Sequence, residues 1–101
     1  MAELQITEKT REKLQKKHGV GPAEVLQCFK NRDASRKILF DTREEHKTDP
    51  ATCWFLAKTN TGRLLKICFI PPHPGNAGAV EIKTAFEPNE QEIRIYEKHS
   101  K

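Results

Sequence analysis

The clearest pattern of apolar and polar positions lies in the middle of the chain, between residues 53 and 70. Two runs there, Cys53 to Thr59 and Arg63 to Ile70, are rich in aromatic and aliphatic residues that favour strands. The residues Asn60-Thr61-Gly62 separate the two runs, and such residues commonly form the turn of a hairpin. The pattern therefore predicts two antiparallel strands joined by a short turn.

Two more strands are predicted, one on each side of this hairpin. Arg36 to Asp41 is a short apolar run between charged residues. Ala79 to Phe86 alternates between apolar and polar positions, which is typical of a strand with one buried face. The residues predicted to share that face are Val80, Ile82 and Phe86. The stretch 71–78 is rich in proline and glycine, so it is predicted to be a loop.

Two helices are predicted before the strands. The first runs from about Glu8 to Lys17, with Thr7 as its N-cap and Gly19 just beyond its end. The second begins sharply at Gly21-Pro22, because glycine can cap a helix and proline suits its first position. This second helix is predicted to end near Asn31.

A third helix is predicted at the end of the sequence. Asn89 and Glu92 have the spacing of a capping box, and the helix then continues to about Lys98. The predicted order is two helices, four strands and one helix. We therefore expect a single α+β domain over residues 1–101, with a four-stranded antiparallel sheet packed on helices.

The charge of the chain is positive and unevenly distributed. The formal net charge is +4, and residues 30–66 hold nine Lys and Arg against five Asp and Glu. A basic surface of this kind attracts nucleic acid or an acidic protein through its long-range field and the release of counterions. An equally simple interpretation is a solvated surface that keeps the protein soluble.

Several classes of protein are disfavoured by the sequence. No apolar run has the length of a membrane span, and the first residues lack a signal-peptide pattern, so we expect a cytoplasmic protein. The three cysteines, Cys28, Cys53 and Cys68, are predicted to be reduced and buried. Their spacing relative to the histidines fits no zinc site, so neither a metal nor another cofactor is expected.

Most of the residues suited to RNA cleavage lie in the loop that precedes the hairpin. Cleavage without a metal needs a base for the ribose 2′-hydroxyl, cations near the phosphate and an acid for the leaving oxygen. His46 is the candidate acid or base, because its usual pKa lies near neutrality, and Glu45 or Glu44 is an alternative base. Arg43 and Lys83 are candidates for holding the phosphate.

A second set of residues is suited to binding nucleic acid along the hairpin. Trp54 offers a ring on which a base can stack, and Lys58, Arg63 and Lys66 offer cations for phosphates. Strand alternation predicts that Arg63 and Lys66 point to opposite faces of the sheet. Each residue also has a structural interpretation: an aromatic residue in a strand is usually buried in the core, and exposed lysines often only line a solvated face.

Two short motifs stand out in the first half of the chain. Lys17-His18-Gly19-Val20, followed by Glu24 and Phe29, is similar to the opening motif of the BrnT family of bacterial toxins. Asp41 with Arg43 looks like the family's loop after its first strand.

The second half continues the resemblance in the same order. Gly62-Arg63-Leu64-Leu65 is similar to the hairpin motif of the family. Ile82-Lys83-Thr84-Ala85, with Glu92 and Tyr96 after it, resembles the family's final segment. The resemblance implies a RelE-like fold.

Two functions are expected from this resemblance and from the residues themselves. BrnT proteins are small cytosolic ribonucleases, each neutralised by a partner antitoxin that also binds DNA. The resemblance thus implies the toxin component of a type II toxin–antitoxin system, a metal-independent endoribonuclease with RNA as substrate and a cognate antitoxin as partner. The alternative is a non-catalytic module on the same fold, whose basic face binds a protein or nucleic acid.

Overall fold

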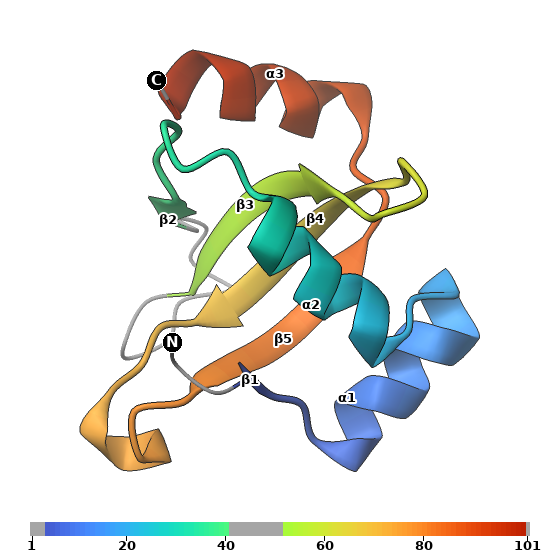
Figure 1. Cartoon of the computed structure of the whole chain (residues 1–101), viewed down its shortest axis with the longest axis vertical. Helices are drawn as coiled ribbons and strands as arrows, with labels where there is room; N and C mark the ends of the chain where they lie inside the picture. Colours follow the sequence, from blue (N-terminus) through green and yellow to red (C-terminus); the bar gives the residue numbers. More distant parts are fainter. Residues whose placement is uncertain (1–3, 41–51, 101) are drawn as a thin grey trace.

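Over the part of the chain that the structure describes, three α-helices pack on a five-stranded mixed sheet in an α+β fold (Figure 1). The computed structural model describes residues 4–40 and 52–100. The strands are β1 (Leu4–Gln5), β2 (Leu39–Phe40), β3 (Cys53–Lys58), β4 (Leu64–Ile70) and β5 (Val80–Phe86). Their order across the sheet is β1-β5-β4-β3-β2, and all neighbours are antiparallel except β1 and β5.

The helices cover both faces of this sheet. They are α1 (Glu8–Lys13), its π-helical continuation η1 (Leu14–His18), α2 (Pro22–Asn31) and α3 (Glu90–His99), with a short 3-10 turn, η3 (Pro74–Asn76), before β5. On the first face, Phe29 of α2 packs edge-on against Phe55 and Phe69. On the second face, Tyr96 of α3 contacts Trp54. The sheet is thus the middle of three layers (Figure 1).

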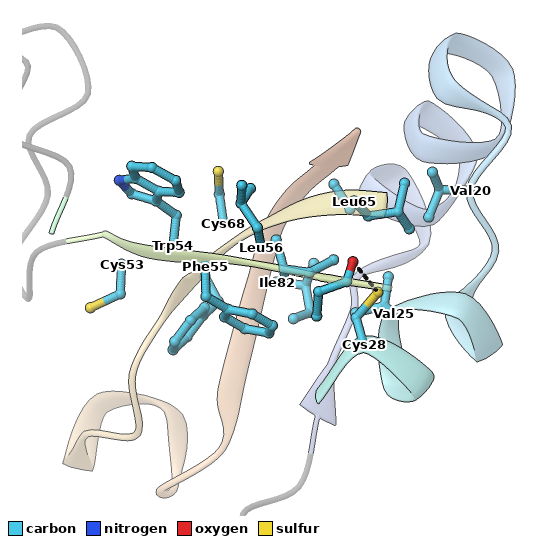
Figure 2. Close-up of a cluster of buried hydrophobic side chains, with 14 of the residues drawn as sticks. Val20, Val25, Cys28, Cys53, Trp54, Phe55, Leu56, Leu65, Cys68 and Ile82 are labelled. Atoms are coloured by element: carbon cyan, nitrogen blue, oxygen red, sulfur yellow. Dashed lines mark hydrogen bonds between the residues drawn. The ribbon is translucent and has the colours of Figure 1, made fainter. Parts of the chain in front are cut away.

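Alternation along β3 and β4 explains why both faces are apolar. In β3 the side chains of Cys53 and Phe55 lie on the face covered by α2, whereas Trp54 and Leu56 lie on the opposite face (Figure 2). All four are buried. A strand in the middle of three layers has no solvated face, so its sequence is continuously apolar rather than alternating.

The predicted hairpin and the second and third helices are confirmed. Gly62 has a φ of 88°, which favours glycine, and its N–H donates to the Thr59 carbonyl at 2.9 Å. Helix α2 begins at Pro22, as predicted. In α3 the Asn89 side chain accepts the Glu92 N–H at 2.8 Å, which completes the predicted capping box.

The prediction of a four-stranded antiparallel sheet is confirmed in part: the four predicted strands pair antiparallel, but a fifth strand joins them and makes the sheet mixed. The short strand β1 precedes the helices and pairs in parallel with β5, Leu4 opposite Val80. Two residues are too few to show a strand pattern, and the pairing joins distant parts of the sequence. Neither property leaves a local signal.

The strand predicted over residues 36–41 is shorter in the structure, because its beginning contacts α3 instead of the sheet. Among the described residues of that range, only Leu39 and Phe40 pair with β3. The Lys37 N–H donates to the Ser100 carbonyl at 2.5 Å, and Arg36 Nη1 donates to the Ser100 hydroxyl at 3.1 Å. These bonds hold the segment against the end of α3.

A bulge in β5 corrects the predicted face assignment of that strand. Phe69 pairs with Ile82 but Cys68 pairs with Thr84, so Lys83 is an extra residue without a partner in the register. The extra residue reverses the alternation after it. Phe86 therefore lies on the opposite face from Ile82, and the prediction that the two share a face is wrong.

The first predicted helix changes geometry halfway. Regular α-helix ends at Lys13, and Leu14–His18 continue as one π-helical segment. Gly19 ends it with a φ of 61°. Leu14, the first residue of η1, is fully buried in the core.

Candidate nucleic-acid interface

The predicted catalytic residues fall mostly in one segment. Arg43, Glu45 and His46 lie within residues 41–51, outside the described residues. Lys83 is described and lies at the bulge of β5, with 44% of its side chain exposed. Its Nζ is 3.8 Å from Glu81 Oε2, a weak contact between two partly exposed groups.

Paired residues of β2, β3, β4 and β5 form a row across the sheet, and this row ends next to Lys83. Phe40 of β2 pairs with Cys53 of β3. Phe69 of β4 pairs with Cys53 on one side and with Ile82 of β5 on the other. Lys83 directly follows Ile82, so it lies level with the residues of this row.

The described residues on either side of the segment 41–51 belong to the same row. The segment begins after Phe40 and ends before Thr52, which directly precedes β3. Neighbouring strands are about 4.8 Å apart, so β3 and β5 are separated by about 10 Å. The register therefore brings Lys83 level with Phe40 and Cys53, which lie in the sequence on either side of the segment that carries the other predicted catalytic residues.

Lys66 and Trp54 lie beneath α3, on the second face of the sheet. Lys66 Nζ is 2.5 Å from Glu92 Oε2, 4.5 Å from the Trp54 ring centre and 5.5 Å from the Phe86 ring centre. The other carboxylate oxygen of Glu92 accepts the Asn89 N–H at 3.0 Å. The ammonium is therefore enclosed by two aromatic rings and one carboxylate, an arrangement that stabilises a buried cation.

Arg63 joins the hairpin to the helical layer on the first face. Its Nη2 and Nη1 donate to the carbonyls of His18 and Gly19 at 2.7 and 2.9 Å. Its Nε donates to Glu87 Oε1 at 2.8 Å, and Nη1 is 3.3 Å from Glu24 Oε2. The hydrogen bond with Glu87 is the main reason why the pKa of Arg63 is raised above its usual value. The guanidinium thus satisfies the carbonyls that end η1.

The four predicted binding residues do not form one surface. Arg63 contacts η1 and α2, whereas Lys66 contacts α3, which confirms that they point to opposite sides of the sheet. Trp54 is buried with Lys66, and only Lys58 is well exposed. Their predicted role in nucleic-acid binding stays a prediction, and for Trp54 and Lys66 it would require α3 to move.

A larger group of exposed cations lies on α1 and η1, where no binding residue was predicted from the sequence. They are Lys9, Arg11, Lys13, Lys16 and Lys17, all exposed. The same stretch carries two acidic residues, Glu8 and Glu12. A count of charges over residues 8–18 would have indicated this surface, because its excess of positive charge is denser than that of residues 30–66.

The three cysteines are buried, reduced thiols. Burial is the main cause that raises the pKa of Cys28 to about 11, and the nearby Glu24 carboxylate adds to it. Burial also raises the pKa of Cys53. Cys28 Sγ donates to the Ala57 carbonyl at 3.7 Å (Figure 2). A nucleophile needs an accessible thiolate, so this environment disfavours Cys28 in that role.

We expect Cys28 to react slowly with a thiol reagent in the native protein. A pKa of about 11 instead of 9.0 leaves about a hundredfold less thiolate at pH 8. Labelling by iodoacetamide, followed by peptide mass spectrometry, measures the rate at each cysteine. The same protein in urea is the control, in which all three cysteines should label readily. Native labelling of Cys28 at the urea rate would contradict its burial.

Two chemical features are absent from the part of the chain that is described. Residues 4–40 and 52–100 contain no group of three His, Cys, Asp or Glu side chains placed to hold a metal ion. No helix in those ranges combines the length and the apolar composition needed to cross a bilayer.

The candidate interface is supported only by the contacts and distances described above. Neither family models, nor curated proteins, nor solved structures gave a match to this chain.

Proposed function

We propose that the protein is a BrnT-like, metal-independent endoribonuclease, the toxin component of a type II toxin–antitoxin pair. The observation that carries the proposal is the row across the sheet that brings Lys83 level with Phe40 and Cys53, which lie on either side of the segment 41–51 in the sequence. Residues distant in the sequence can act on one phosphate only if the fold brings their attachment points to one region. The α+β architecture is compatible with the RelE-like fold that we infer from the resemblance.

The proposed reaction is an attack of the ribose 2′-oxygen on the adjacent phosphorus. His46 or Glu45 takes the proton of the 2′-hydroxyl, the bond from phosphorus to the 5′-oxygen breaks, and an acid protonates that oxygen. The products are a 2′,3′-cyclic phosphate and a 5′-hydroxyl. Arg43 and Lys83 stabilise the charge that develops on the phosphate oxygens.

We expect His46→Ala to lower the rate of RNA cleavage by at least about a hundredfold, because general acid–base catalysis contributes about that much. Arg43→Ala and Lys83→Ala should also lower the rate. The assay follows cleavage of an end-labelled RNA in EDTA. An RNA with deoxyribose at the cleavage site should remain intact, since it lacks the attacking hydroxyl.

Matched variants on the exposed side of α3 control for the loss of a histidine or a lysine. His99→Ala and Lys98→Ala should cleave like the wild type, because both side chains are exposed on the last turn of α3 and neither has a role in the proposed reaction. Cleavage at the wild-type rate by the His46, Arg43 and Lys83 variants would refute these roles. A wild-type protein that leaves every RNA intact in EDTA would refute the ribonuclease proposal.

A second candidate is a non-catalytic binding module on the same fold. The observation in its favour is that Arg63 and Lys66 are engaged within the fold, whereas the cations of α1 and η1 are exposed. Such a module would bind RNA or an antitoxin without cutting RNA. Induced expression in bacteria separates the two functions: growth arrest with discrete RNA cuts supports the ribonuclease, and intact RNA supports the module.

A further inference from the structure

A basic surface formed by α1 and η1 has no role in the fold or in the proposed reaction. We call it the α1–η1 surface, and its cations are Lys9, Arg11, Lys13, Lys16 and Lys17. Lys9 and Lys13 follow the spacing i, i+4, which places them on one side of α1, and Lys16 and Lys17 follow on η1. From Lys9 to Lys13 the α-helix rises about 6 Å, and η1 extends the row of cations beyond that.

The lysines of this surface are not held by carboxylates of the described residues. None of Lys9, Lys13, Lys16 and Lys17 forms an ion pair there, whereas Arg63 and Lys66 both do. Arg11 is 4.0 Å from Glu8, and both side chains are largely exposed, so this pair contributes little. The lysine charges are therefore available to a partner.

The composition of the surface favours a phosphate backbone over a protein. Leu14 is the one apolar residue between Glu8 and His18, and it is 1% exposed, so the surface offers no apolar anchor. Protein–protein interfaces have apolar cores and are depleted in lysine. Lysine acts as a flexible point charge, which suits phosphates that are contacted without reading bases.

We propose that the α1–η1 surface docks the phosphate backbone of RNA without sequence preference. This inference rests on the proposed function, because it takes RNA as the substrate, and it adds a binding surface distinct from the proposed catalytic residues. Binding strength would come mainly from α1 and η1, whereas cleavage would depend on the segment 41–51 and Lys83. Glu12 lies among the lysines and weakens the local positive field.

The test compares two triple variants with the same change in charge. In the surface variant, Lys9, Lys13 and Lys16 are replaced by glutamine. In the control variant, Lys30, Lys37 and Lys98 are replaced by glutamine; these lysines are exposed elsewhere on the molecule. The parent protein and both triple variants carry His46→Ala to limit cleavage. Fluorescence anisotropy follows the binding of a labelled 20-nucleotide RNA at several salt concentrations. Circular dichroism checks that each variant is folded.

We expect the surface variant to bind RNA at least about tenfold more weakly than the control variant in 0.1 M salt. The slope of log affinity against log salt should become shallower by about 2, because each single-strand phosphate contact contributes about 0.7. The single substitution Glu12→Gln should act in the opposite direction and strengthen binding.

Each outcome decides a different point. Equal RNA affinities of the two triple variants would overturn the α1–η1 surface as the RNA site while leaving RNA binding intact, and an acidic protein would then be the partner to test. A parent protein with His46→Ala that shows no salt-dependent RNA binding would refute both the surface and RNA as the substrate. Weakened binding in the surface variant, with unchanged cleavage at saturating RNA when His46 is restored, would support both proposals.

Discussion

Replacing Glu92 with glutamine should lower the free energy of unfolding by about 3 kcal/mol, because it leaves a buried cation without its carboxylate. The Lys66 side chain is only 6% exposed, and that of Glu92 is 18% exposed. Glutamine keeps the size of the side chain and can still accept the Asn89 N–H. The measurement is urea unfolding followed by Trp54 fluorescence, and the midpoint of thermal unfolding should fall by more than about 10 °C.

Glu90→Gln is the matched control on the same helix. Glu90 pairs with Arg94 at 2.8 Å, but both side chains are more than three-quarters exposed, so its loss should change stability by less than about 0.5 kcal/mol. Combining Glu92→Gln with Lys66→Met should restore most of the loss, because the uncompensated charge is gone. A Glu92→Gln protein as stable as Glu90→Gln would show that the buried pair does not hold α3 on the sheet.

This pair also bears on the prediction that Trp54 and Lys66 bind nucleic acid. As long as α3 is held by Glu92, neither side chain is available to a base or a phosphate. If these residues bind RNA, α3 must first be displaced, which costs free energy. RNA should then raise the stability of the folded protein less than a ligand that binds while α3 stays in place. The exposed lysines of α1 and η1 need no such movement.

Local chemistry explains the elements that the sequence predicted well. The turn at Gly62, the proline at the start of α2 and the capping box of Asn89 with Glu92 each depend on residues within a few positions of one another. Such interactions leave the same signature in the sequence wherever the chain folds. The hairpin and these two helices were therefore predictable.

The remaining features depend on contacts between distant segments. The parallel pairing of Leu4 with Val80 and the bonds from Arg36 and Lys37 to Ser100 join opposite parts of the chain. The alternation of β4 placed Lys66 on one face, but it could not show that α3 covers that face. The basic character of the hairpin was predictable from the sequence. The burial of Trp54 and Lys66 beneath α3 was not.

Arg63→Ala should lower the free energy of unfolding by about 2 kcal/mol, because hydrogen bonds to carbonyls and carboxylates are lost together. The largest share should come from the carbonyls of His18 and Gly19, since Glu87 is largely exposed and its ion pair contributes little. Arg63→Lys should restore only a small part, because one ammonium cannot reproduce the planar arrangement of donors. Urea unfolding measures the stability of both variants.

The location of the damage distinguishes this structural role from a general loss of charge. Hydrogen exchange should speed up most at the amides of Gly19 and Val20, which end η1 beside the lost guanidinium. Arg94→Ala, which removes an exposed arginine from α3, should leave those amides unchanged. If Arg63→Ala protein, kept well below its unfolding temperature, binds RNA like the wild type, Arg63 acts by joining the hairpin to η1. A tenfold weaker affinity in that folded state would instead assign it to the RNA interface.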